Sequence, residues 1–407
     1  MDYIKDIIGF DAEAIDALDL HTLQESGSDK WSRYPGAIGA FIAEMDFGTA
    51  PCIQQAVENA AKQCALGYIP EPWKERVAQA CAFWQRARFG WNVDWHIIRP
   101  VPDVIEAYEF FIRDIVGAGH SVIVPTPAYM PFISVPRLYG VSVIEIPMLQ
   151  HQESWEFDFD SIERAFADGC RAFVLCNPHN PIGKVLNREE LKRISDLAEQ
   201  YNVRIFNDEI HAPFVFGNCE HISYPTLSER AARQSMTATS ASKSFNIPGT
   251  KCAQVILTNE DDYQLWMDRA QWSEHQTATI GAIASTAAYM GGGLWFDQVL
   301  QYVQRNADLL DHRLRTEFPE IDYVRPQGTY IAWLDFNRAG IEEPADFFLK
   351  NANVALTDGA ECGDIGHGCV RMNFAMPYPL LEECLNRMRT ALDKLITQRV
   401  SSVALAG

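Results

Sequence analysis

The chain has 407 residues, 47% of them hydrophobic, and a formal net charge of −20 at pH 7. This length and composition allow a large buried core divided over two or three domains. The negative charge argues against partners such as nucleic acid or an anionic membrane, although a local basic pocket could still hold one phosphate.

The first residues, MDYIKDIIGFDAEAID, are acidic and contain no long apolar run. They lack the pattern of a signal or transit peptide, so a cytoplasmic protein is expected. No later stretch of about 18 apolar residues predicts a membrane span. No metal is expected either, because three groupings lack the paired spacing of a zinc site: Cys362 with His367 and Cys369, Cys219 with His221, and Asp208 with His211.

Residues 51–282 alternate short apolar runs with helical stretches. This alternation predicts an α/β domain with a doubly wound, mostly parallel sheet. One helix is expected after Asn187, a good N-cap residue with Glu190 three positions later. The continuous, β-branched runs predict strands that are buried on both faces, at 121–127, 141–147, 171–178, 202–209 and 252–258.

The rest of the chain has a different pattern, which predicts a smaller α+β domain. A long helical run near 283–317 is followed by three strand-like runs and a final amphipathic helix, at 321–326, 329–336, 368–375 and 380–396. Residues 1–50 are expected to fold onto this second part, so that the small domain comprises 1–50 and 283–407.

Polar clusters follow three of the predicted strands: PAYMPF after 126, NPHNPIG after 176 and DEIH after 207. Ligands of open α/β sheets lie at the carboxyl ends of the strands, so one site built from several loops is expected.

The stretch TATSASKSFNIPGTK, residues 237–251, contains Lys243 among small residues and hydroxyls. The spacing Ser240-x-x-Lys243 also occurs in penicillin-binding serine enzymes, but this chain lacks their Ser-Asp-Asn or Tyr-x-Asn and their Lys-Thr-Gly. A solvated surface lysine is a second reading. Lys251 follows closely in the same small-residue loop. Two lysines so close together indicate an anion-binding site and a lysine amine whose positive charge is suppressed.

Four motifs, CNPHNPIGKV, NDEIHAPFVF, SASKSFNIPGTKCAQ and TPAYMPF, together carry a family resemblance that extends over nearly the whole chain. The chain resembles fold-type I enzymes of the class I/II aminotransferase superfamily, which use pyridoxal 5′-phosphate (PLP). Within that group it looks most like the MalY/PatB branch of cystathionine β-lyases. The resemblance implies a large PLP-binding domain and a smaller α+β domain.

The resemblance also implies roles for residues around the cofactor ring. Lys243 would be the Schiff-base lysine and catalytic base, and Asp208 would keep the ring nitrogen protonated. Asn180 would donate to the ring's phenolate oxygen and contact substrate. His211 would lie near the same oxygen, unless it is an ordinary core histidine on an apolar strand. Tyr129 would stack on the ring.

Further residues would bind the phosphate and the substrate. Ser240 and Lys251 would contact the phosphate, and RPVPDVIEAY would form the helix start that cradles it. There Val101 can donate an N–H, whereas Pro100 cannot. Tyr68 would reach the phosphate of a neighbouring subunit, which implies a homodimer. Two residues would bind the amino-acid substrate: Arg371, through its α-carboxylate, and Ala43, through its nearby backbone.

The implied activity is a carbon–sulfur β-lyase that releases pyruvate, ammonia and a thiol from cystathionine or another cysteine S-conjugate. An aminotransferase would use the same residues and is the alternative. A non-catalytic regulator with this fold is a third possibility, but the chain retains Lys243, Asp208, Asn180 and Arg371 together.

Overall fold

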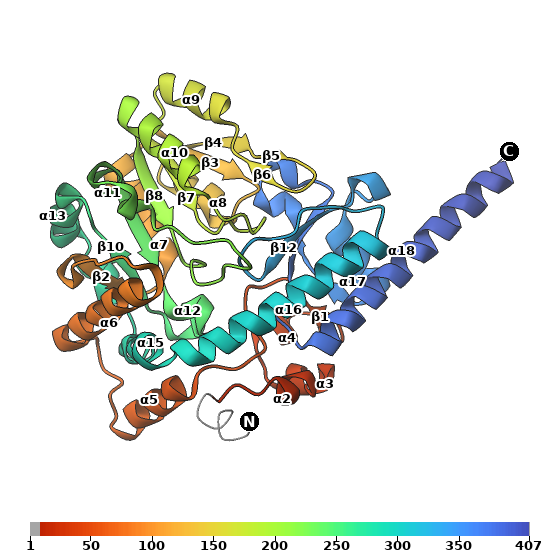
Figure 1. The fold of residues 1–407 in the computed structure, drawn as a ribbon, viewed down its shortest axis with the longest axis horizontal. Helices are drawn as coiled ribbons and strands as arrows, with labels where there is room; N and C mark the ends of the chain where they lie inside the picture. The colour runs from red at the N-terminus through yellow and green to blue at the C-terminus, as the bar shows by residue number, and fades with distance from the viewer. Residues whose placement is uncertain (1–8, 407) are drawn as a thin grey trace.

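The computed structural model describes residues 9–406, and a seven-stranded sheet lies at its centre (Figure 1). The strand order is β2-β10-β9-β8-β7-β3-β4. Neighbouring strands from β9 to β4 run parallel, which confirms the predicted mostly parallel α/β sheet. The strands are Ile98–Val101 (β2), Ser121–Thr126 (β3), Ser142–Pro147 (β4), Ala172–Cys176 (β7), Arg204–Asp208 (β8), Ser235–Thr239 (β9) and Ala253–Ile256 (β10).

Helices cover both faces of this sheet. Successive side chains of a strand point to opposite sides, so a continuously apolar strand has two apolar faces that must be buried. In β3, Val122 and Val124 face one core, while Ile123 faces the other. The first core includes α7 (Val104–Phe110), α8 (Pro131–Leu138) and α13 (Glu260–Arg269), and the second includes α9 (Phe159–Ala167), α10 (Arg188–Gln200) and α11 (Glu229–Gln234). Burial on two faces explains why these strands are continuously apolar.

The predicted start of α10 is confirmed. The side chain of Asn187 accepts hydrogen bonds from the backbone N–H groups of Glu189 and Glu190, each at 2.9 Å. The Glu190 carboxylate accepts in turn from the Asn187 N–H, also at 2.9 Å. This reciprocal pair is a capping box, which satisfies N–H groups that the helix itself cannot pair.

The strand predicted at 252–258 is present as β10, and it is an exception to the parallel arrangement, because it runs antiparallel to both β9 and β2. A parallel neighbour requires a crossover of a dozen or more residues, usually through a helix that returns the chain to the other end of the sheet. Between β9 and β10 the structure has only the short α12 (Ala241–Ser244) and a 3-10 turn, Pro248–Thr250. The chain therefore turns back at the same end. The sequence pattern also missed β2 and β9.

The C-terminal part contains a four-stranded antiparallel sheet of order β11-β12-β15-β14. The three predicted strands are confirmed, and β14 is additional. The long helical run is divided between two helices, with Gly292 between them. The elements are α15 (Thr279–Gly291), α16 (Gly293–Glu317), β11 (Asp322–Tyr323), β12 (Ile331–Asp335), α17 (Pro344–Ala352), β14 (Thr357–Asp358), β15 (Cys369–Asn373) and α18 (Tyr378–Ala406).

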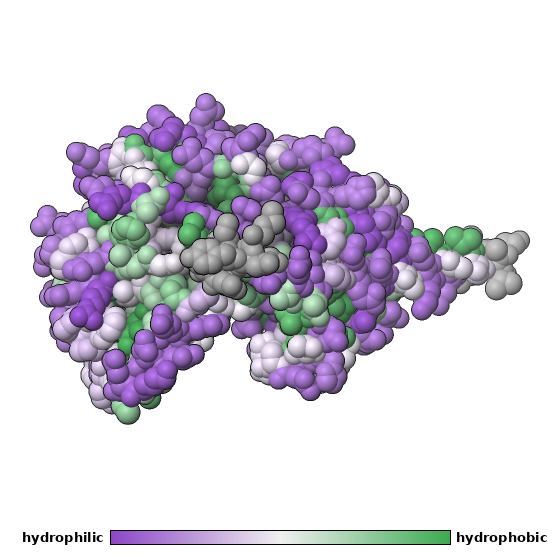
Figure 2. Space-filling view, turned by 60° about the horizontal axis from the view of Figure 1, so that its bottom comes forward, coloured by the Kyte–Doolittle hydropathy of each residue, from purple (hydrophilic) through white to green (hydrophobic). Residues whose placement is uncertain are grey.

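The end of α18 projects from the body of the molecule, and hydrophobic side chains show on it (Figures 1 and 2). Val400, in this helix, is 65% exposed. Among residues 9–406, none of the helices has the length and apolar character needed to cross a bilayer.

The N-terminal segment is attached to the C-terminal part by a strand pair and by a hydrogen bond from the buried Lys30, which also forms an ion pair within the segment. β1 (Ile38–Gly39) pairs in parallel with β13 (Val354–Ala355). The Lys30 ammonium lies 2.8 Å from an Asp46 carboxylate oxygen and donates to the carbonyls of Glu44 and Ala375 at 3.1 and 3.3 Å. The boundaries of the two expected domains stay a prediction. The remaining helices are α2 (Ala12–Asp16), α3 (Leu20–Glu25), α4 (Asp29–Ser32), α5 (Pro51–Lys62), α6 (Glu71–Phe89) and α14 (Gln271–His275).

Replacing Lys30 by Met should lower the free energy of unfolding by about 3 kcal/mol, because a buried carboxylate would lose its cation. Urea unfolding followed by circular dichroism measures this change. Lys192→Met is the matched control, since Lys192 pairs with Asp196 on the exposed face of α10. It should have no measurable effect. Equal losses for the two variants would contradict a special contribution from the buried pair.

Candidate active site

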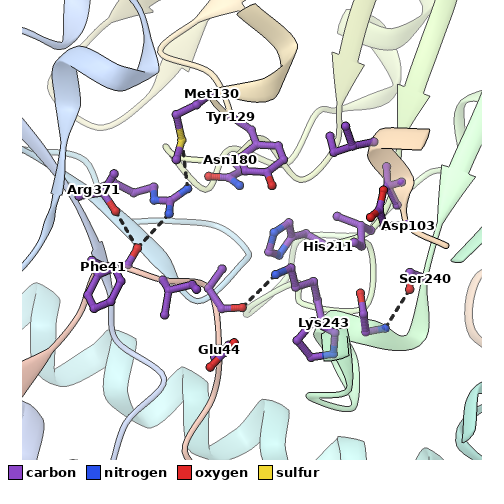
Figure 3. Close-up of a pocket in the computed structure, with 18 of the residues that line it drawn as sticks. Phe41, Glu44, Asp103, Tyr129, Met130, Asn180, His211, Ser240, Lys243 and Arg371 are labelled. Carbon is purple, nitrogen blue, oxygen red and sulfur yellow. Dashed lines mark hydrogen bonds between the residues drawn. The ribbon is translucent and has the colours of Figure 1, made fainter. Parts of the chain in front are cut away.

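A cavity of about 520 Å³ lies where the carboxyl ends of the central strands meet the N-terminal segment and β15. Tyr129 follows β3, Asn180 follows β7, and Asp208 ends β8, so side chains from these three strand ends line one cavity. Nine of the residues expected from the resemblance line this cavity (Figure 3): Ala43, Tyr129, Asn180, Asp208, His211, Ser240, Lys243, Lys251 and Arg371. Val101 and Tyr68 do not.

Lys243 extends from α12 into the cavity, where its Nζ donates to the carbonyl oxygen of Ala43 at 2.9 Å. Burial and, to a smaller extent, the positive charge of Arg371 lower the pKa of this amine to about 8, against the opposing effect of the carboxylates of Glu44 and Asp208. A substantial fraction of the amine is therefore neutral at mildly alkaline pH. A neutral amine can act as a nucleophile and can accept a proton.

Asp208 is the last residue of β8, and one of its carboxylate oxygens accepts from the N–H of Ile210 at 2.9 Å. Burial raises the pKa of this carboxyl to about 7, and neighbouring Glu209 also raises it. Because the described residues give Asp208 no ion-pair partner, a cation bound in the cavity would restore its charge. The environment of Asp208 therefore fits a protonated ring nitrogen.

Asn180 and His211 present polar atoms that lack hydrogen-bond partners among residues 9–406. These atoms are the side-chain oxygen of Asn180 and Nδ1 of His211, both buried. Burial lowers the pKa of His211 to about 3, and the charges of Lys243 and Arg371 act in the same direction, so the ring is neutral. His211 lies in a turn after β8 rather than on an apolar strand, which corrects the expectation. Buried polar atoms without partners are expected where a ligand supplies them.

Tyr129 forms part of the cavity wall next to Asn180 (Figure 3). It is half-buried, and its ring packs edge-on against Phe132 with centroids 5.6 Å apart. Its burial raises the pKa of the phenol, so the hydroxyl stays protonated near neutral pH. An aromatic wall of this kind can cover one face of a planar ligand.

Arg371 lies on β15 with only 5% of its surface exposed. One guanidinium nitrogen donates to the carbonyl of Phe41 at 2.9 Å, and another lies 3.7 Å from the sulfur of Met130. No carboxylate within the described part of the chain pairs with it. A buried guanidinium is costly without an anion, so Arg371 is suited to bind a carboxylate from a ligand.

The opposite end of the cavity contains groups that suit a phosphate. Ser240 caps α12, and its hydroxyl donates to the Cys252 carbonyl at 3.0 Å. The half-exposed Lys251 forms a 3.1 Å ion pair with Asp103, the N-cap of α7. An incoming anion could compete for Lys251 and for the N–H groups at the start of this helix.

Val101 does not reach the cavity wall. It is fully buried in β2, opposite Ala253 of β10. Because the strand continues to Val101, the helix begins only at Val104, and the wall is formed instead by residues 102–105. Pro100 is accommodated because β2 is an edge strand.

Tyr68 lies outside the cavity, in a separate surface hollow with Leu66 and Thr279. The side chain is 83% exposed, and its ring lies 4.8 Å from that of His275. Its expected role depends on a second subunit and stays a prediction.

Several cavity residues were not expected from the sequence. Glu44 and Met130 directly follow Ala43 and Tyr129, so their positions carried a signal. No sequence signal indicated Glu361 and Thr357, which line the cavity, or Tyr330, which lies behind its wall. These residues come from parts of the chain that are distant from the motifs. Within residues 9–406, no three His, Cys, Asp or Glu side chains are grouped so that they could hold a metal ion.

Comparisons with known proteins agree with this geometry. The family model "Aminotransferase class I and II" matches residues 102–388. The chain is 34% identical to a cystathionine beta-lyase of Corynebacterium glutamicum, over 92% of this chain and 99% of the relative. It is 31% identical to Protein MalY of Escherichia coli, over 84% and 88%. It also matches the crystal structure of cystalysin from Treponema denticola, which contains a pyridoxal 5′-phosphate cofactor, with TM-score 0.86, 27% identity and coverage of 91% and 96%.

The pKa of Lys243 predicts its reactivity in protein freed of cofactor. Acylation of Lys243 by an amine-directed reagent should reach half its maximal rate near pH 8. Solvent-exposed lysines should do so only near pH 10.4, the ordinary lysine value. Peptide mass spectrometry after timed labelling measures both. Identical pH profiles for Lys243 and the exposed lysines would contradict a suppressed charge.

Asp208→Asn should stabilise the cofactor-free protein at pH 8 but not at pH 4. The folded carboxyl has a pKa of about 7, above its ordinary value of 3.8. It therefore binds a proton that the unfolded chain has already lost, and its contribution to stability falls as the pH rises through this window. An amide does not titrate, so the variant should gain about 2 to 4 kcal/mol at the higher pH. Urea unfolding at the two pH values measures the gain, and a pH-independent difference would refute this explanation.

Proposed function

The chain belongs to the class I and II aminotransferase family, uses pyridoxal 5′-phosphate and, we propose, is a carbon–sulfur β-lyase. Its substrate would be cystathionine or another cysteine S-conjugate, and its products pyruvate, ammonia and a thiol. The observation that carries the proposal is the presence in one cavity of a half-buried lysine with a lowered amine pKa and a buried arginine without an anion. The similarity to a cystathionine beta-lyase favours elimination over other reactions of the family.

The residues of the cavity fit the cofactor. When bound, PLP supplies an electron sink for negative charge that develops on the substrate α-carbon. We assign the ring nitrogen to Asp208, whose buried carboxyl needs a cation, and the ring oxygen to the side-chain NH2 of Asn180, which lines the cavity. Tyr129 would cover a ring face, and Ser240 and Lys251 would bind the phosphate. His211 would lie near the ring oxygen, and because its ring is neutral it adds no charge there.

The substrate would be held by Arg371 and activated by Lys243, both of which line the cavity. Arg371 binds the α-carboxylate through two parallel hydrogen bonds, which fixes the α-carbon relative to Lys243. The neutral Lys243 amine takes the proton from that carbon. The bond between the β-carbon and sulfur then breaks with its electron pair on sulfur. The ammonium of Lys243 can return the proton to the departing thiolate, and water completes the release of pyruvate and ammonia.

Transamination is the second candidate, because the matching family model is named for aminotransferases. The same residues would serve, but the proton would be returned to the cofactor rather than to the leaving thiolate. That reaction needs a 2-keto acid as acceptor of the amino group, whereas elimination does not.

We further propose a homodimer in which Tyr68 reaches the cavity of the neighbouring subunit. Tyr68, Leu66 and Trp272 are 83%, 67% and 75% exposed, and the ring of His275 contacts both Tyr68 and Trp272. An exposed apolar cluster of this kind is typical of an interaction surface. A cytoplasmic location, and a division into a large domain of residues 51–282 and a small domain of 1–50 plus 283–407, complete the proposal.

A product assay tests the reaction. The purified protein, loaded with PLP, is incubated with cystathionine and a panel of S-substituted cysteines without any keto acid. Equal amounts of pyruvate, ammonia and thiol are expected, and Lys243→Ala should slow their release at least about 1,000-fold, because the base is lost. Turnover that requires an added 2-keto acid would instead establish a transferase. Cofactor binding without either reaction would indicate a non-catalytic role.

A further inference from the structure

The segment from Phe41 to Glu44 crosses the cavity beside Lys243, and side chains from distant parts of the chain bind all four of its carbonyls (Figure 3). The Phe41 carbonyl accepts from Arg371 and from the Thr357 hydroxyl, at 2.9 and 2.6 Å. The amide of Asn373 donates to the two carbonyls of Ile42 and Glu44, at 2.7 and 2.6 Å. The segment has no strand or helix of its own at these positions. Its shape therefore depends on these side-chain contacts.

The Ala43 carbonyl differs from the others because one of its two donors is the reactive amine. Lys243 donates to it at 2.9 Å, and the hydroxyl of Tyr330 donates at 3.0 Å. A carbonyl oxygen has two lone pairs, so these two donors satisfy it completely. If Lys243 turns from this carbonyl toward a ligand, Tyr330 is the donor that stays.

Tyr330 is built to stay in place. It directly precedes β12, and only 1% of its surface is exposed. Its ring packs edge-on against His211 and Phe214, with centroids 5.6 and 4.9 Å apart. These contacts leave the ring little freedom, so the hydroxyl presents a fixed donor to the segment.

We propose that Tyr330 is a positioning residue, which holds the Ala43 carbonyl at a fixed place over the cavity and thereby orients the Lys243 amine. Tyr330 does not line the cavity and touches no reacting atom. It acts through the Ala43 carbonyl, which accepts from the Lys243 amine when that amine is not bonded to a ligand. The effect of Tyr330 on Lys243 rests on the proposed function of Lys243, whereas its effect on the position of Ala43 does not.

The substitution Tyr330→Phe tests the proposal, because it removes the hydroxyl and keeps the ring. Hydrogen exchange of residues 41–46 is measured by mass spectrometry on the full chain loaded with PLP. The exchange should become about fivefold faster, the factor expected for one lost hydrogen bond. The visible absorbance of the bound cofactor should be unchanged. With an S-substituted cysteine, kcat should fall about fivefold or more and KM should change less, because the misoriented group is the base.

Tyr224→Phe is the matched control. Tyr224 is 1% exposed, and its hydroxyl bonds to Gln234 at 2.9 Å outside the cavity. In the Tyr224→Phe variant, hydrogen exchange at residues 41–46 and kcat should stay within about twofold of the parent values, because Tyr224 makes no contact with Ala43.

Unchanged exchange at 41–46 in Tyr330→Phe would overturn the proposal. Faster exchange throughout the chain would overturn it as well, because the hydroxyl would then support stability in general. If the parent shows no lyase activity, the proposed function fails, but the exchange measurement still decides whether Tyr330 holds the segment.

Discussion

Burial of charged groups without protein partners is the constraint on which the site depends. Asp208 and Arg371 are buried and Lys243 is half-buried, and none of the three pairs with another in the described structure. Such an arrangement is costly in an empty cavity, as the raised pKa of Asp208 and the lowered pKa of Lys243 show. A cofactor with a cationic ring nitrogen and a reactive aldehyde, together with a substrate carboxylate, would satisfy all three groups. The unpaired charges therefore reduce the free energy of unfolding of the ligand-free protein. Pairing them with a ligand would contribute to the free energy of binding.

Different elements of the fold supply these charged groups and the residues around them. Parallel strands end at one edge of the sheet, where the end of β8 supplies Asp208 and the segments after β3, β7 and β9 supply Tyr129, Asn180 and Ser240. The antiparallel return from β9 to β10 keeps Lys243 and Lys251 at that same edge. The small sheet contributes Arg371, and the N-terminal segment closes the opposite side. The site therefore exists only when parts from both ends of the chain have assembled.

The charge of the cavity differs from the charge of the whole molecule. The chain carries a net charge of −20, whereas four cations line the cavity together with four carboxyl groups: Arg33, Lys243, Lys251 and Arg371 beside Glu44, Asp103, Asp208 and Glu361. An acidic exterior discourages polyanions, while the local cations can hold one phosphate and one carboxylate. Both features suit an enzyme that binds small anionic and zwitterionic molecules and rejects nucleic acid.

The sequence by itself determined the mostly parallel sheet, the capped start of α10 and the residues whose motifs surround the cavity, because periodicity, capping and strand-end loops are local properties. The tertiary structure alone decided the direction of β10, the exclusion of Val101 from the wall and the exposed position of Tyr68. It also decided the contact between Tyr330 and Ala43, which are 287 residues apart. No local pattern encodes such a contact, because it arises only when the packed core brings β12 against the N-terminal segment.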